Sequence, residues 1–246
     1  MHIPDTPACM AGLWTRSLII LPDGTRDETS AVTWLQGPAL YADLRVPAGR
    51  PDFHAADLGA LSFADCQWLA TQHGFAGLLS AQDGVFSWHR EIDFQPPAPL
   101  PDAGRLFWEG GVLVETGHHA AYREHWHRSP DAPARPAGAL RLQACDDGRA
   151  AILVRAGAWF MFARARGAAL LSGRDLAGCV AAASLAEAQA LVDCELSLGE
   201  AAAWRIARST LPFREGAALA PRRLGSRLLL AGAQWDILME EGETGI

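Results

Sequence analysis

Short segments that alternate apolar and polar residues, each ended by a turn signal, occupy most of this chain. The segment 12–20 (GLWTRSLII) runs into Pro22-Asp23-Gly24, and similar segments lie at 29–36, 39–46, 84–94, 110–117 and 121–128. A second series follows between residues 139 and 241. A period of two places alternate side chains on opposite faces of a strand. Many short strands with frequent turns are typical of barrels and sandwiches, so we expect an all-β protein.

Two proline-rich stretches divide the chain. Residues 95–104 (QPPAPLPDAG) carry four prolines, and residues 129–138 (SPDAPARPAG) carry three. Because proline has no backbone N–H and cannot continue a helix or a ladder, both stretches are predicted loops or linkers. A chain of 246 residues has room for two cores. The second stretch lies just past the midpoint, so we expect one domain over residues 1–130 and another over 137–246.

Each half also contains one helix signal. Ser62 is followed three residues later by Asp65, which resembles a capping box, and Gly74 is the predicted C-terminal glycine of that helix. Ser184 and Glu187 repeat the capping pattern in the second half. The expected fold is therefore two consecutive lipocalin-like or calycin-like β-barrels, each with one short helix.

Several motifs in the middle and at the end of the chain occur together in a known family. Residues 110–166 contain E-T-G, Y-R-E-x-W and an apolar strand leading into G-x-W, and residues 232–241 contain G-x-x-W before apolar and acidic residues. With these motifs the chain resembles a fungal family named for its interaction with a casein-kinase-type protein kinase. The first half is also similar to uncharacterised bacterial proteins. The resemblance implies two consecutive calycin-type barrels and a protein partner, and it carries over no catalytic residue.

A G-x-W motif opens the first strand of lipocalin-like barrels, and this chain has one copy in each half, at 12–14 and 157–159. About one such match is expected by chance in a chain of this composition, so the value of the motif lies in its position. Both copies lie in strand-like segments, which favours the two-barrel fold.

Composition and missing motifs exclude several classes of protein. The formal net charge is −7 and no basic stripe appears, so a nucleic-acid partner is not expected. No apolar run reaches the length of a membrane span, and the first residues lack the pattern of a signal peptide. The five cysteines are scattered without C-x-x-C, which disfavours disulfides and a zinc site. We therefore expect a cytoplasmic protein with no membrane partner.

Catalytic signatures are also missing. The sequence has no G-x-S-x-G, no phosphate-binding loop and no G-x-G-x-x-G. Asp43 with Glu115, or Asp93 with Glu124, are candidate carboxylate pairs, but no spacing brings either pair together. The sequence indicates no particular cofactor and no catalytic residue, and it favours a non-enzymatic role.

One face of the first-half strands mixes large rings with charges. Solvated faces normally carry charges without tryptophan, and ordinary cores carry rings without arginine. A barrel lumen that holds one ligand accommodates both. We therefore expect the first barrel to bind a small anionic or aromatic molecule in its lumen. The alternation extends the same face to Leu18, Ile92 and Phe94. The candidate ligand-binding residues are Trp14, Arg16, Tyr41, Asp43, Arg45, Trp88, Arg90, Tyr122, Glu124 and Trp126.

The alternative is a protein-interaction or scaffold module whose barrels are filled by side chains. Arginine–carboxylate pairs then brace the interior, tryptophans plug the ends, and a protein partner needs an exposed apolar patch. The second half, apolar and rich in alanine around residues 149–166, is expected to have a packed interior. Trp204 and Trp235 are expected core or interface residues.

His125 and His127 form an H-x-H pair, a spacing that a strand can present to a metal. His89, His118 and His119 are candidate additional ligands, but no second motif supports a site. We expect the pair to lie on the outer face of the barrel, opposite Trp126, and we assign no metal ligand.

Overall fold

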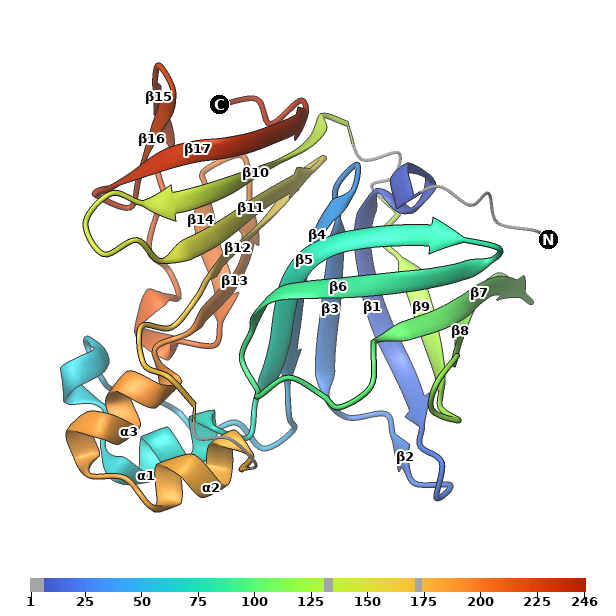
Figure 1. Cartoon of the computed structure of the whole chain (residues 1–246), viewed down its shortest axis with the longest axis horizontal. Helices are drawn as coiled ribbons and strands as arrows, with labels where there is room; N and C mark the ends of the chain where they lie inside the picture. Colours follow the sequence, from blue (N-terminus) through green and yellow to red (C-terminus); the bar gives the residue numbers. More distant parts are fainter. Residues whose placement is uncertain (1–6, 131–134, 171–173) are drawn as a thin grey trace.

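The computed structural model describes residues 7–130, 135–170 and 174–246. Residues 131–134, in the predicted linker, lie outside this range. Two β-sheets pack side by side, with a small layer of helices at one end (Figure 1). The all-β prediction with two barrel-like halves is confirmed: one half is a closed barrel and the other a half-barrel.

The first sheet has nine strands in the order β2-β1-β3-β4-β5-β6-β7-β8-β9. β1 also pairs with β9, so eight of these strands close a barrel, and β2 extends from β1. The strands are β1 (Gly12–Ile20), β2 (Arg26–Asp27), β3 (Ala31–Gln36), β4 (Leu40–Val46), β5 (His73–Gln82), β6 (Val85–Asp93), β7 (Ala103–Glu109), β8 (Val112–Gly117) and β9 (Arg123–Arg128).

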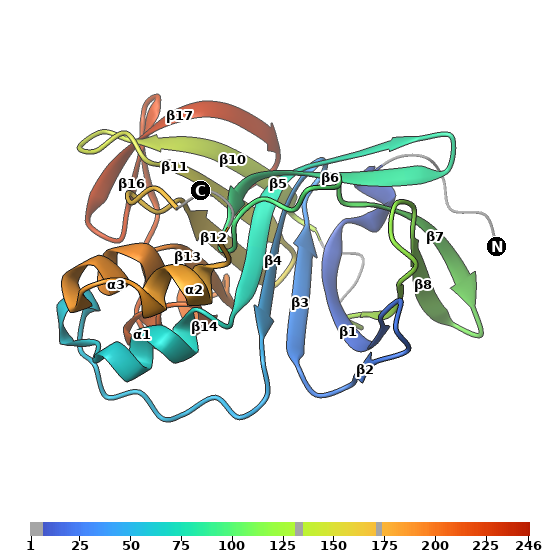
Figure 2. The same cartoon turned by 60° about the horizontal axis from the view of Figure 1, so that its bottom comes forward.

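The second sheet has eight strands in the order β14-β13-β12-β11-β10-β17-β16-β15, and its outer strands do not pair with one another. It curls into a half-barrel (Figure 2). The strands are β10 (Ala137–Ala144), β11 (Ala150–Ala156), β12 (Trp159–Arg164), β13 (Glu195–Glu200), β14 (Arg205–Ser209), β15 (Arg222–Leu224), β16 (Arg227–Leu230) and β17 (Ala233–Gly242).

Three short α-helices from both halves lie together (Figure 2). They are α1 (Phe63–Leu69), α2 (Leu176–Ala181) and α3 (Leu185–Val192), and short 3-10 turns occur at η1 (Pro7–Met10), η2 (Leu58–Ala60) and η3 (Pro212–Arg214). Both predicted capping boxes form, at Ser62 and Ser184. The expectation of one helix per half is wrong for the second half, because Asp175 caps the additional helix α2 without a capping-box partner.

The predicted helix end at Gly74 is also wrong. Helix α1 ends at Leu69, and Gly74 lies in β5. A Cβ atom at this glycine would stand 2.8 Å from the Asp43 carbonyl oxygen and 3.2 Å from a methyl group of Leu196. Gly74 is therefore needed where β5 packs closely against β4 and the second sheet.

One hydrophobic core spans both halves. The side chains of β4 alternate between the barrel interior and its outer surface, and the outward set packs against the second sheet and the helices. This set comprises Leu40, Ala42, Leu44 and Val46, and its partners in the second half include Ile152, Val154, Met161 and Leu196. β4 is consequently buried on both faces, and the two halves stabilise each other.

A β-bulge in β1 changes which side chains enter the barrel. Arg16 pairs with Trp126, whereas Leu18 pairs with His125, so Ser17 is an extra residue in the ladder. Because one extra residue reverses the direction of the side chains that follow, the placement of Leu18 on the ligand face is wrong. Ile19 lines the barrel cavity instead.

A second bulge acts in the same way on β6. Arg90 pairs with Gly77 and Ile92 with Ala76, which leaves Glu91 as the extra residue. Ile92 and Phe94, expected on the ligand face, belong instead to the core that the two halves share. The prediction fails here because local alternation cannot reveal a bulge.

Tryptophans fill one part of the barrel lumen. Trp34 stacks on Trp14 at a centroid distance of 5.8 Å, and it meets Trp88 and Trp126 edge-on at 5.8 and 5.7 Å. Trp108 lies 6.0 Å from Trp14. Ring pairs of this kind contribute about 0.5–1.5 kcal/mol each beyond their buried area. This part of the lumen is packed with side chains.

The central position of Trp34 predicts a large effect of its removal. We expect Trp34→Ala to lower the free energy of unfolding by about 3–5 kcal/mol, because a buried ring with three ring neighbours leaves a cavity. Urea unfolding measures the change. Trp108→Ala is the matched control, since Trp108 is only half-buried and touches one other tryptophan. Equal losses in the two variants would contradict a central role for Trp34.

Candidate functional site

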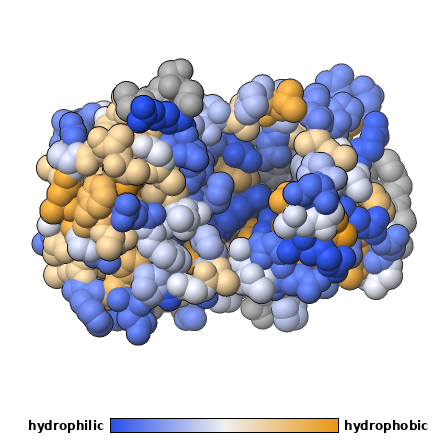
Figure 3. All heavy atoms as spheres, turned by 90° about the horizontal axis from the view of Figure 1, so that it is seen from below, coloured by the Kyte–Doolittle hydropathy of each residue, from blue (hydrophilic) through white to orange (hydrophobic). Residues whose placement is uncertain are grey.

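A cavity of about 240 Å³ lies in the part of the barrel lumen that the tryptophans leave open. Seven of the ten candidate ligand-binding residues line it: Asp43, Arg45, Trp88, Arg90, Tyr122, Glu124 and Trp126. They come from three different strands, β4, β6 and β9, and from the turn before β9, and period-two alternation is what directs the strand residues inward. Viewed from below, the molecule is hollowed near its middle, and hydrophilic residues dominate the hollow (Figure 3).

The other three candidate residues lie near the cavity without lining it. Trp14 is fully buried in the tryptophan cluster, and Arg16 is held beside the cavity by Glu124. Tyr41 is fully buried, stands edge-on to Phe75 at 6.0 Å, and its hydroxyl has no hydrogen-bond partner among the described residues.

Glu124 links two arginines at the wall of the cavity. The Nη1 atom of Arg16 lies 2.7 Å from Glu124 Oε1, and Nη1 of Arg45 lies 3.6 Å from the same oxygen. Each arginine also has a second carboxylate, Asp27 at 3.2 Å for Arg16 and Asp43 at 2.7 Å for Arg45. Glu124 is 3 % exposed, so this network replaces the hydration that the charges lose.

Arg90, on β6, is held in the same manner. It pairs with Asp93 at 3.0 Å and with Asp102 at 2.6 Å. Its guanidinium carbon lies 3.5 Å from the centre of the Phe75 ring, and that of Arg45 lies 4.9 Å from the same centre. Cation–π attraction therefore adds to the ion pairs in fixing both arginines.

Glu115, on β8, lies directly opposite Glu124 on β9. Its Oε1 accepts a hydrogen bond from the Tyr122 hydroxyl at 2.7 Å, and its Oε2 accepts one from Trp126 Nε1 at 3.1 Å. Burial raises the pKa of Glu115 well above the ordinary value of 4.5, and the charges of Glu124 and Asp102 raise this pKa further. Glu115 therefore keeps its proton at a pH at which an exposed glutamate has lost it.

Glu115 and Asp102 line the cavity but were absent from the predicted ligand-binding set. Glu115 stands two residues after Leu113, which also faces the lumen, so strand alternation is the signal that points to it. Of the candidate carboxylate pairs, Asp43 and Glu115 line the same cavity, and the strand register places Glu115 directly opposite Glu124. Asp102 lies within the proline-rich stretch 95–104, directly before β7, and no local pattern places it.

His125 and His127 lie on the outer face of the barrel, opposite Trp126. A ring nitrogen of His127 lies 2.8 Å from the Ser17 hydroxyl, and His125 accepts a hydrogen bond from Arg123 at 3.2 Å. Within the described ranges, no group of three histidine, cysteine, aspartate or glutamate side chains has a geometry that holds a metal ion.

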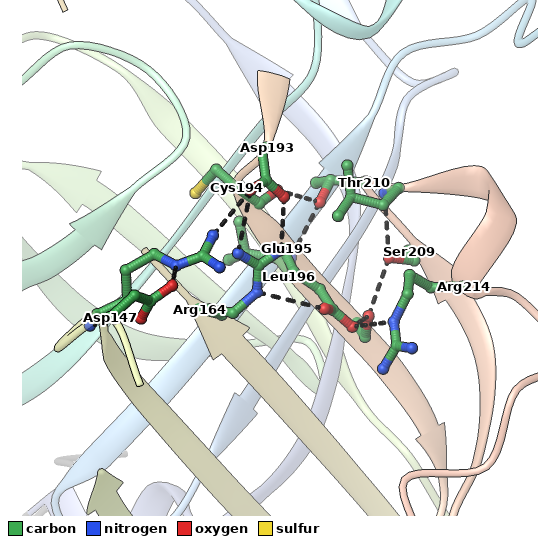
Figure 4. A network of polar contacts seen from close by, with 12 residues as sticks. Asp147, Arg164, Asp193, Cys194, Glu195, Leu196, Ser209, Thr210 and Arg214 are labelled. Atoms are coloured by element: carbon green, nitrogen blue, oxygen red, sulfur yellow. Dashed lines mark hydrogen bonds and ion pairs between the residues drawn. The ribbon is translucent and has the colours of Figure 1, made fainter. Parts of the chain in front are cut away.

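The half-barrel carries a similar network of arginines and carboxylates (Figure 4). Glu195, 3 % exposed, accepts hydrogen bonds from the Ser197 hydroxyl at 2.8 Å and from Arg214 at 3.0 Å. Arg164 binds Asp193 at 2.6 Å. A cavity of about 220 Å³ lies beside these groups, so the expectation of a fully packed interior does not hold at this end of the half-barrel. Trp235 is buried in its apolar part, as expected.

No protein-family model matches the chain, and no curated protein matches it either. Among solved structures, the chain is similar to an uncharacterized protein of Saccharomyces cerevisiae, YLR301w. The TM-score is 0.53 at 13 % sequence identity, and the alignment covers 94 % of this chain and 98 % of the yeast protein. This likeness shows that the two proteins share a fold.

The ion pair between Arg16 and Glu124 predicts a marked loss of stability when it is broken. We expect Arg16→Met to lower the free energy of unfolding by about 3 kcal/mol, because Glu124 then keeps only the distant Arg45. Arg26→Met is the matched control: its pair with Glu28 is more than half exposed and contributes at most about 1 kcal/mol. Denaturant titration of both variants gives the comparison, and equal losses would contradict the buried network.

Glu115 predicts a characteristic dependence of stability on pH. Its pKa is raised in the folded state, so above pH 4.5 the unfolded chain releases this proton while the folded protein retains it. The contribution of Glu115 to folding therefore becomes less favourable as pH rises, by up to about 1.4 kcal/mol per pH unit. Glu115→Gln removes this slope. The free energy of unfolding of the variant, relative to the wild type, should rise between pH 5 and pH 8 in urea titrations.

The test depends on how the difference in free energy of unfolding changes with pH, and not on the size of that difference at any one pH. A glutamine nitrogen cannot accept the hydrogen bond from Trp126, which lowers the stability of Glu115→Gln by an amount that does not depend on pH. A constant difference between wild type and variant across the pH range would mean that Glu115 titrates as an exposed glutamate.

Proposed function

We propose that the first barrel binds a small aromatic molecule in its cavity and catalyses no reaction on it. The support comes from the composition of the wall, in which Phe75, Trp88 and Trp126 provide apolar surface beside a few fixed polar groups. Small-molecule sites typically combine these features. A volume of about 240 Å³ is below the range of about 300–1,000 Å³ of drug-sized sites, so a single ring with a short substituent fits best.

The charges around the cavity favour the aromatic over the anionic ligand class. Arg16, Arg45 and Arg90 each bridge two carboxylates of the protein itself. An anionic ligand would have to compete with these carboxylates for guanidinium groups and would meet the remaining acids. An aromatic ligand leaves the ion pairs intact.

The position of the cavity supports a lipocalin-like role for the first half, because barrels of this size hold a ligand in the lumen. We also propose a cytoplasmic location. Its support is that Cys66, Cys179 and Cys194 are buried thiols that form no disulfide. No helix in the described ranges has the length and hydropathy to cross a membrane.

A protein-interaction role is the second candidate, in line with the fungal family that the sequence resembles. One observation favours it: hydrophobic residues gather over the helical end of the molecule, at the left of Figure 3. Leu185, at the start of α3, is 46 % exposed there. A partner would cover this surface and would leave the barrel cavity unused.

Closing the cavity mouth tests the proposed ligand site. Ala120 lines the cavity and is exposed, whereas its neighbour Ala121 is exposed and lies outside the lining. We expect Ala120→Trp to weaken binding of single-ring probes such as benzyl alcohol and benzylammonium by about tenfold or more, because the added ring blocks entry. Ala121→Trp should change the affinity for the same probes by less than twofold. Tryptophan fluorescence reports binding, since Trp88 and Trp126 line the site.

Failure of every probe to bind the wild-type protein would overturn the proposal. Equal effects of the two substitutions would place the binding site elsewhere on the protein.

A further inference from the structure

The carboxyl groups that line the cavity outnumber the guanidinium groups. Four acids and two arginines contribute to the lining: Asp43, Asp102, Glu115, Glu124, Arg45 and Arg90. Three of these acids form an ion pair with an arginine: Asp43 with Arg45, Asp102 with Arg90, and Glu124 with Arg16, which lies beside the cavity. Among the described residues, Glu115 has no ion-pair partner, and its two hydrogen-bond donors are neutral. One buried carboxyl group in this site therefore has no cation.

The protein itself leaves no room for that cation. Gly104 of β7 packs so closely that a Cβ atom there would lie 3.0 Å from Glu115 Cγ and Oε1. The charged and titratable groups that face Glu115 are Glu124 and Tyr122 from the β9 side, Asp102 before β7 and Arg45 of β4. Arg45 is already committed to Asp43 and Glu124. A positive charge can reach Glu115 only from the cavity.

Two tryptophan rings in the cavity wall also suit a cation. Trp88 and Trp126 line the cavity, and in the described ranges no arginine lies over either ring. The faces of Phe75, in contrast, attract both Arg45 and Arg90. Tryptophan is the aromatic side chain that binds cations most strongly. The site thus combines an unmatched carboxyl group with aromatic surface that no protein cation occupies.

We propose that the ligand of this cavity is a small organic cation, an ammonium group carried on a single ring, which places its charge against Glu115. The inference rests on the proposed function and narrows its ligand class. When the cation enters, Glu115 releases its proton to solvent and becomes the carboxylate that faces the ammonium group. One proton is therefore released for each cation bound, and no covalent bond of the ligand is altered.

This exchange has a measurable consequence. Raising the pH favours loss of the proton, so affinity for the cation should rise with pH, by up to about tenfold per unit while Glu115 is protonated. The raised pKa of Glu115 supports this direction. Calorimetric titration of the full chain with benzylammonium at pH 6, 7 and 8, in buffers of different ionisation enthalpy, measures both the affinity and the number of protons released.

A neutral analogue, benzyl alcohol, and an anionic analogue, benzoate, provide the comparison with benzylammonium. We expect benzylammonium to bind at least about tenfold more tightly than benzyl alcohol at pH 8, and benzoate to bind more weakly still. Up to one proton should be released with the cation and none with the alcohol. Glu115→Gln should abolish the pH dependence. Glu109→Gln, which removes an exposed carboxylate of the same barrel that pairs with Arg123, should leave it unchanged.

The outcomes separate this inference from the proposed function. If none of the three probes binds, both fail. If benzyl alcohol or benzoate binds as tightly as benzylammonium, the cavity binds a ligand, but the inference that this ligand is a cation fails. Binding of benzylammonium without proton release overturns the role of Glu115. The proton count is measured on the wild-type protein, so it stands even if Glu115→Gln does not fold.

Discussion

Pairing of buried charges is the constraint on which the rest of the first barrel depends. Arg16 stands on β1 and Glu124 on β9, the two strands whose pairing closes the barrel. Both side chains are buried, and a buried charge without a partner is costly, so the closure of the sheet and the ion pair support each other. The same network leaves Glu115 opposite Glu124 without a cation, and the proposed ligand would supply that charge.

The lumen divides into a packed part and an open part. Stacked and edge-on tryptophans around Trp34 fill the first, and ion pairs surround the cavity in the second. The packed part gives the cavity a rigid wall, because Trp88 and Trp126 contact Trp34 on one side and face the cavity on the other. Rigid walls lower the entropic cost of holding a small ligand.

The second half also contains a buried glutamate between two arginines, although its sheet is open. Glu195 is buried among Arg164 and Arg214 as Glu124 is buried among Arg16 and Arg45. Every guanidinium and carboxylate named in that network has a partner inside the protein, which distinguishes it from Glu115. The outer face of β4 joins the halves through one core. The yeast protein shares the fold along 94 % of this chain at 13 % identity, so the arrangement of two sheets tolerates wide changes of sequence.

Local patterns in the sequence determined most of the strands, two capped helices and most of the inward-facing residues, but they did not reveal β5 or β7. Ser62 and Ser184 cap their helices through neighbours three residues away, and Tyr41, Asp43 and Arg45 enter the barrel because strands alternate. Tertiary structure alone decided the bulges at Ser17 and Glu91, because a bulge depends on the register with a partner strand. The opposition of Glu115 and Glu124 and the core shared by the two halves likewise arise from contacts between strands, which residue spacing along one strand does not encode.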